Sequence, residues 1–133
     1  MNQFENKIKK IDLLFNSEID GTNINKLKFA YLNKPNLLFV IKTKKGKRFG
    51  AYSIEIFLEK EFNKSDNKAF LFSLDKMTIM KSNNRDHSIW NKECNSIQFG
   101  GQTDLRIFYN FSSYKNYTWE RRSEFADYDY QNY

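Results

Sequence analysis

Apolar residues near the N-terminus recur at the spacing of a helix. Phe4, Ile8, Ile11 and then Leu14 or Phe15 follow one another at intervals of three or four residues, which places them on one face of a helix. The pattern predicts an amphipathic first helix from Phe4 to Phe15.

A second, shorter helix is predicted after a turn at Asp20 and Gly21. Thr22 can cap its N-terminus, since a threonine hydroxyl accepts a hydrogen bond from a backbone N–H of the first turn. Pro35 should end it, because the residue before a proline is pushed out of the helical region. The residues expected to face inward are Ile24, Leu27 and Ala30 or Tyr31.

Beyond Pro35 the pattern changes to short β-type runs separated by turn residues. Leu37 to Ile41 is a continuous apolar run, as in a strand covered on both faces, and Gly46 lies at the centre of a predicted hairpin turn. From Leu105 onward every second residue is apolar, the period of a strand with one face in the core. The predicted strands are Leu37–Ile41, Arg48–Ile56, Ala69–Leu74, Met77–Met80, Ser88–Trp90, Ser96–Phe99 and Leu105–Phe111.

The order of these elements indicates an α+β, β-rich fold of antiparallel sheets, either one sheet or a sandwich. Two polar stretches, Glu59 to Asn67 and Lys81 to His87, are predicted to be loops, and no element is predicted after Phe111. The chain shows no internal repeat and no linker, so we expect residues 1–133 to form a single domain.

Composition adds two expectations. Aromatic residues make up 17% of the chain, with 13 Phe and 8 Tyr, so large rings should fill much of the core. Cys94 is the only cysteine, which excludes an internal disulfide and a cysteine-based structural zinc site. With no apolar run long enough to span a bilayer and no secretory signal, we expect an intracellular protein, either cytoplasmic or organelle-associated.

The net charge of +6 raises the question of nucleic acid. The basic residues gather in two clusters, which are Lys7, Lys9 and Lys10, and Lys42, Lys44, Lys45, Lys47 and Arg48. Runs of this kind are usually solvated surface. Binding to nucleic acid through the second cluster, with nearby aromatic rings stacking on bases, therefore remains an alternative rather than the leading interpretation.

Three segments, in this order and spacing, resemble the TLDc domain family. They are NLLFVIKT (36–43) running into GKRFGAY (46–52), then SDNKAFLFSL (65–74), and then IQFGGQTDLRI (97–107). Ala51 stands where the family has the second glycine of its turn, and the resemblance covers about Asp20 to Ile107. The residues that carry the family pattern are Phe49, Gly50, Tyr52, Phe70, Phe72, Phe99, Gly100 and Asp104.

The TLDc resemblance implies two antiparallel sheets packed as a sandwich with peripheral helices. It also implies protein binding, with members linked to oxidative-stress protection and to binding and regulating the vacuolar proton-pumping ATPase. The family closes with a further strand that residues 123–133 match poorly, so the closing strand has either diverged or is lacking. A lacking strand would leave a sheet edge that a partner could complete.

Residues able to do chemistry are few. His87 is the only histidine and lies in a polar run, which favours a solvated loop residue over a member of a catalytic triad. Cys94 has Lys92 two residues away and could be a redox-sensitive thiol, but a small, partly buried side chain is favoured. Asp104 is expected to accept hydrogen bonds from the turn before it.

The remaining acids and glycines show no functional spacing. Asp66, Asp75 and Asp86 do not have the spacing of a calcium loop, and the glycines form no phosphate-binding motif. We therefore expect no metal, no cofactor and no catalytic residue. The aromatic residues of the tail could form either an interface or part of the core, and they are Tyr114, Tyr117, Trp119, Phe125, Tyr128, Tyr130 and Tyr133.

The leading hypothesis is a non-enzymatic protein-interaction module. The vacuolar ATPase is the first candidate partner, and a structural subunit of another large intracellular complex is the alternative within this class. From other classes, the sequence leaves open a basic nucleic-acid-binding domain and a thiol-dependent antioxidant enzyme that uses Cys94.

Overall fold

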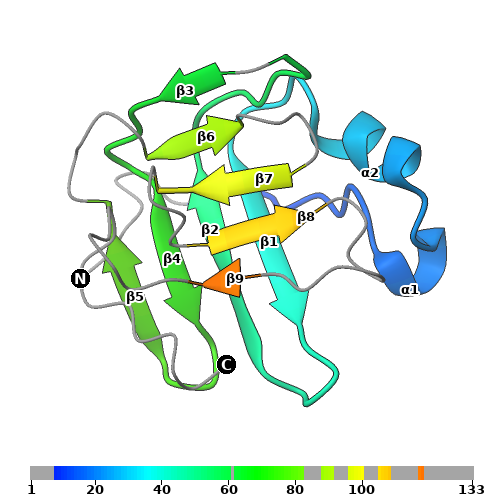
Figure 1. The fold of residues 1–133 in the computed structure, drawn as a ribbon. Coiled ribbons are helices and arrows are strands. Elements are labelled where there is room, and N and C mark those ends of the chain that lie inside the picture. Colours follow the sequence, from blue (N-terminus) through cyan, green and yellow to red (C-terminus); the bar gives the residue numbers. More distant parts are fainter. Residues whose placement is uncertain are drawn as a thin grey trace.

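Two antiparallel sheets make up most of the computed structural model, which describes residues 8–60, 62–82, 88–91, 96–100, 105–108 and 117–118 (Figure 1). One sheet has four strands in the order β1-β2-β4-β5, and the other has five in the order β3-β6-β7-β8-β9. The elements are α1 (Ser17–Asp20), α2 (Ile24–Tyr31), β1 (Leu37–Lys42), β2 (Arg48–Ser53), β3 (Phe62–Lys64), β4 (Phe70–Ser73), β5 (Thr78–Lys81), β6 (Ile89–Asn91), β7 (Ser96–Phe99), β8 (Leu105–Phe108) and β9 (Tyr117–Thr118).

The β1–β2 hairpin forms where the sequence predicts it. Its register runs from Leu37 opposite Ser53 to Lys42 opposite Arg48. Gly46 takes a φ of 83°, a region that favours glycine, and its N–H donates to the Thr43 carbonyl at 2.9 Å. The turn is therefore set by local chemistry.

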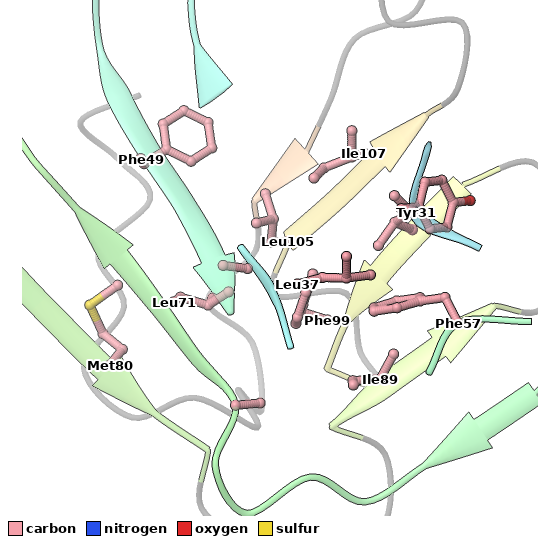
Figure 2. Close-up of a cluster of buried hydrophobic side chains, with 13 residues drawn as sticks. Tyr31, Leu37, Phe49, Phe57, Leu71, Met80, Ile89, Phe99, Leu105 and Ile107 are labelled. Carbon is pink, nitrogen blue, oxygen red and sulfur yellow. The ribbon is translucent and has the colours of Figure 1, made fainter. Parts of the chain in front are cut away.

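The two sheets pack face to face around a core (Figure 2). The four-stranded sheet contributes Leu37, Phe49, Ala51, Leu71 and Met80, and the five-stranded sheet contributes Ile89, Ile97, Phe99, Leu105 and Ile107. In Figure 1 strands β6, β7 and β8 cross in front of β1, β2 and β4 at a steep angle. The expected strand-rich fold with two packed antiparallel sheets and few short helices is confirmed.

Aromatic rings join the sheets to α2. Phe39 of β1 lies 5.7 Å from Phe57 and 6.0 Å from Phe99 of β7, measured between ring centroids. Tyr31, at the end of α2, makes edge contacts with Phe39 and Phe57. Edge-to-face geometry of this kind adds to the free energy of area burial. The core is aromatic-rich, as the composition predicts.

The second helix is confirmed, but its cap is not the predicted residue. The side chain of Asn23, rather than Thr22, accepts hydrogen bonds from the N–H groups of Asn25 at 2.9 Å and Lys26 at 3.4 Å. At the other end, the Lys34 ammonium donates to the Ala30 carbonyl at 2.7 Å. Both ends of α2 thus have partners for backbone groups that the helix leaves unpaired.

The predicted first helix is wrong over the part that the structure describes. Residues 8–16 have no regular secondary structure, and α1 begins only at Ser17. Asn16 has extended dihedral angles, its side chain accepts from the Glu18 N–H, and its own N–H donates to Asp20 Oδ2 at 2.8 Å. Asn16 therefore starts a new helix instead of continuing an earlier one.

Two other boundaries differ from the predictions. The stretch from Glu59 to Asn67 is not wholly an exposed loop, because it contains β3 and the buried Asp66. The predicted strand from Leu105 is described as far as Phe108, and β9 pairs with it where no element was predicted. Both strands form by pairing with other strands, β3 with β6 and β9 with β8, which no local pattern reveals.

Candidate functional site

The face of the four-stranded sheet that points away from the core is the candidate site, and we call it the outer face. Directly paired residues of an antiparallel sheet have their side chains on the same face, and residues of one strand alternate between faces. The pairing of the four strands therefore defines its members, which are Leu38, Val40, Lys42, Arg48, Gly50, Tyr52, Phe70, Phe72, Ile79 and Lys81.

A row of four residues crosses the outer face at Gly50. Val40 pairs with Gly50, Gly50 with Phe72, and Phe72 with Ile79. A Cβ atom built on Gly50 would come within 1.8 Å of the Phe39 carbonyl oxygen and 2.6 Å of the Phe72 ring. The Phe72 ring thus occupies the space that any side chain at position 50 would need, and only glycine fits there.

A second row carries a ring stack. Tyr52 and Phe70, which are paired residues, stack with ring centroids 5.2 Å apart. The Tyr52 hydroxyl donates to Asn36 Oδ1 at 3.3 Å, although that contact is exposed. Burial raises the pKa of Tyr52, and the negative charge of Asp66 raises it further. The hydroxyl therefore stays protonated and remains a hydrogen-bond donor.

Other apolar residues of the outer face are open to solvent. Val40 is 61% exposed, Leu38 is 46% exposed, and Ile79 on the opposite edge strand is 51% exposed. Phe70 and Phe72, between the edges, are buried. The interpretation of Leu37 to Ile41 as a strand covered on both faces is therefore wrong, because β1 is an edge strand with only one face in the core.

Basic side chains border the hairpin end of this face. Lys42 and Arg48 are exposed on β1 and β2 at this end. Lys81, exposed on β5, lies at the opposite end of the face, in the row of Tyr52 and Phe70. Asp75, in the β4–β5 turn, accepts from the Arg48 guanidinium at 3.0 and 3.1 Å and from the Arg48 N–H at 2.5 Å. These hydrogen bonds hold the pKa of the Asp75 carboxyl below its usual range. Asp75 thus neutralises Arg48 at this border.

A buried carboxylate supports the loops beside the outer face. Asp66 is 2% exposed, and its Oδ2 accepts from the Ser53 hydroxyl at 2.7 Å and from the Ile54 N–H at 3.0 Å. Its Oδ1 accepts from the Lys68 N–H at 2.9 Å. Hydrogen bonds to a carboxylate are roughly twice as strong as neutral ones, so Asp66 ties the end of β2 to the start of β4.

The residues of the family pattern separate into two groups. Gly50, Tyr52, Phe70 and Phe72 come together on the outer face. Phe49 and Phe99, by contrast, point into the core between the sheets. The pattern therefore combines a core contribution with an outer-surface contribution.

Gly100 forms a turn after β7. It takes a φ of 80°, and its N–H donates to the Ser88 carbonyl at 2.9 Å. Its carbonyl accepts from Gln98 Nε2 at 3.0 Å. Outside the described residues lie Asp104, His87, Cys94, Asp86 and the side chains of the aromatic tail.

Sequence reasoning missed both the buried role of Asp66 and the exposure of β1. Asp66 lies among polar residues that are typical of a turn, and nothing in this pattern indicates that its side chain is buried. For β1, a signal lay in Lys42, Lys44 and Lys45, because lysines often mark edge strands.

The rest of the described chain adds two observations. The described residues contain no group of three or more His, Cys, Asp or Glu that could hold a metal ion. Within the same part of the chain, no helix is long and apolar enough to cross a membrane.

Comparison with known proteins bears on the whole chain. No curated protein matches it. The family model of the TLDc domain matches residues 1–132, well beyond the segment from Asp20 to Ile107 that carries the motifs. Gly50, Tyr52, Phe70 and Phe72, which carry the pattern, form one continuous part of the outer face. The chain belongs to the TLDc domain family.

Proposed function

We propose that this chain is a non-enzymatic protein-interaction module of the TLDc type that binds its partner through the outer face of the four-stranded sheet. Membership of the TLDc family supports a role as a module of that kind. The observation that carries the choice of surface is the exposure of Leu38 and Val40 on the edge strand β1.

The outer face has the layout of a binding surface. Exposed apolar side chains on β1 and β5 lie on either side of the buried rings Phe70 and Phe72. Gly50 leaves the space that the Phe72 ring occupies, and the Tyr52 hydroxyl donates to Asn36, so the rings at the centre of the face are already in place. A preformed surface loses little conformational entropy on binding.

The charged residues at the border of the outer face indicate which kind of partner surface would bind there. The residues that border the apolar positions of β1 at the hairpin end are cations, Lys42 and Arg48, and Asp75 already pairs with Arg48. A polar rim around an apolar centre is the usual arrangement of protein interfaces. The partner surface should therefore be apolar with an acidic rim next to Lys42.

Family resemblance supplies the first candidates. TLDc resemblance implies binding to the vacuolar proton-pumping ATPase and a link to oxidative-stress protection, and we propose both for this chain. A structural role in another large complex is the alternative. The presence or absence of ATPase subunits among the proteins captured with the chain distinguishes the vacuolar ATPase from another complex as the partner.

The test is affinity capture from cell extract with the tagged chain and two charge-matched variants. Val40→Glu places a carboxylate on the apolar part of the outer face. Met77→Glu adds the same charge at a position that is 86% exposed in the β4–β5 turn, away from β1. We expect one assembly, near stoichiometric with the chain, that Val40→Glu removes and Met77→Glu retains.

Two results would count against the proposal. Recovery of no reproducible assembly would oppose the interaction function. An assembly that survives Val40→Glu would show that the partner binds elsewhere. Since both substituted side chains are exposed, equal thermal unfolding midpoints of the variants serve as the check on folding.

A further inference from the structure

The net positive charge of the chain comes from its first part, because basic and acidic residues nearly balance in the rest. Residues 1–54 hold 11 of the 22 Lys and Arg but only 4 of the 16 Asp and Glu, a net charge of +7. Residues 55–133 hold the other 11 basic and 12 acidic residues, a net charge of −1. Such asymmetry between parts of a chain indicates an anionic partner for the basic part.

Large apolar side chains are unusually exposed in this same part. Ile11 is 71% exposed and Leu13 is 75% exposed in the irregular segment before α1. Ile19 of α1 and Phe29 of α2 are exposed by 77% and 87%. Figure 1 shows α1 and α2 together at one end of the molecule. Large exposed apolar groups mark an interaction surface, and these four belong to one stretch of the chain, residues 11–29.

The segment from Ile8 to Phe15 combines a helical pattern with a non-helical structure. At 3.6 residues per turn, Ile8, Ile11 and Phe15 would lie within roughly 60° of one another. The backbone over residues 8–16 is nevertheless irregular, and Ile8 and Ile11 are largely open to solvent. Within the described residues, Ile8 and Ile11 of the apolar face that the sequence encodes are thus left open, while Phe15 is half-buried.

We propose that the segment Ile8–Phe15 binds an anionic lipid surface as an amphipathic helix, with Ile8, Ile11 and Phe15 facing the acyl chains. Lys9 and Lys10 are both exposed and would meet the lipid headgroups, for which Lys10 would leave its ion pair with Asp12, 2.8 Å away. Helices that lie in the membrane interface combine an apolar face with lysines on the polar face. In this segment Lys9 and Lys10 would lie on the polar side, with Leu13 between them. Lys44 and Lys45, exposed in the hairpin turn, add an attraction over a longer range.

Exposed aliphatic side chains favour lipid over nucleic acid. Single-stranded nucleic acid binds to flat aromatic rings and to cations, whereas the aliphatic side chains of Ile8 and Ile11 offer neither. Insertion of aliphatic groups below the headgroups, by contrast, buries apolar area directly. This membrane role stands apart from protein binding at the outer face, so either can fail without the other.

The test is sedimentation of the full chain with vesicles of equal parts phosphatidylserine and phosphatidylcholine, and with vesicles of phosphatidylcholine alone. Ile11→Glu and Leu13→Glu form a matched pair, because both positions are more than 70% exposed and both gain the same charge. In a helix the two side chains lie roughly 160° apart, but in an extended segment they lie on the same side.

We expect binding to the anionic vesicles that weakens as salt is raised, and far less binding to phosphatidylcholine alone. Ile11→Glu should weaken binding at least about tenfold more than Leu13→Glu, since the added charge is common to both. Equal losses would overturn the helical mode. Failure to bind anionic vesicles, including the case in which the chain binds a DNA duplex instead, would overturn the lipid proposal.

Discussion

Gly50 and its neighbour Ala51 show how adjacent residues of one strand face opposite sides of the sheet. Gly50 faces outward, where the Phe72 ring and the Phe39 carbonyl take up the space of a side chain. Ala51 faces inward and is fully buried, paired with Phe39 and Leu71 on the adjacent strands. The replacement of the family's second glycine by alanine is therefore accommodated on the core side of the sheet.

Gly50→Ala should destabilise the chain strongly. Because the clash involves a backbone oxygen, β1 and β2 would have to separate, and we expect a loss of about 2–3 kcal/mol in the free energy of unfolding. Gly46→Ala is the control, since a Cβ there meets nothing within 4 Å and only the positive φ is penalised, by about 1 kcal/mol. Urea unfolding measures both. Equal losses would show that the contact with Phe39 relaxes freely.

Asp66 shows what single-residue patterns cannot reveal. In the sequence it is one of several short polar residues in a turn, and its hydrogen bond from the Lys68 N–H fits that interpretation. Its bonds from Ser53 and Ile54 span 13 and 12 residues of chain. Those two bonds give it a structural role between strands, and they depend on how β2 and β4 pair.

At the scale of elements, β1 and the segment before α1 depart from their predictions for related reasons. A continuous apolar run predicts burial on both faces, yet the position of β1 at the sheet edge leaves Leu38 and Val40 exposed. A helical period predicts a helix, yet Asn16 starts α1 after it. In both cases the sequence contains the apolar residues, but the described part of the chain provides nothing that covers them fully.

The cap of α2 gives a prediction at this scale. Asn23→Ala removes an acceptor for the N–H groups of Asn25 and Lys26, and N-cap removal costs about 1 kcal/mol. Thr22→Ala alters the neighbouring, exposed residue and should change the free energy of unfolding by less than about 0.5 kcal/mol. The free energies of unfolding of the two variants, measured by chemical denaturation, show whether Asn23 or Thr22 caps α2. A larger loss for Thr22→Ala would restore the prediction from sequence.

At the scale of the whole molecule, the connection between the sheets depends on a ring cluster centred on Phe57, which lies outside the regular elements. Phe57 lies in the chain between β2 and β3 and is 2% exposed. Its ring contacts Tyr31, Phe39 and Phe99, which come from α2, β1 and β7. One side chain thus holds a helix and both sheets together.

Phe57→Ala should therefore weaken the entire fold. Removal of a buried phenylalanine costs about 3–5 kcal/mol, a large part of the stability of a domain this size. Phe29→Ala removes the same ring from a position that is 87% exposed and should cost less than about 0.5 kcal/mol. Thermal unfolding followed by circular dichroism compares them. A small shift for Phe57→Ala would mean that the cluster is not shared by the two sheets.

The sequence by itself determined the hairpin, the second helix, most of the strands and the family. Strand positions followed from apolar runs and turn residues, as in the hairpin at Gly46, and α2 followed from its helical period. These features depend on a few neighbouring residues, whose backbone preferences and hydrogen bonds are visible in a short window. The three motifs were likewise sufficient to indicate the TLDc family to which the chain belongs.

Only the tertiary structure decided which apolar residues are buried. The sheet order placed β1 and β5 at edges, brought Gly50, Tyr52, Phe70 and Phe72 together, and buried Asp66 between segments distant in sequence. It also left Ile11 and Leu13 exposed. Burial depends on contacts between residues far apart in the chain, and the free energy of those contacts outweighs local propensity wherever the two conflict.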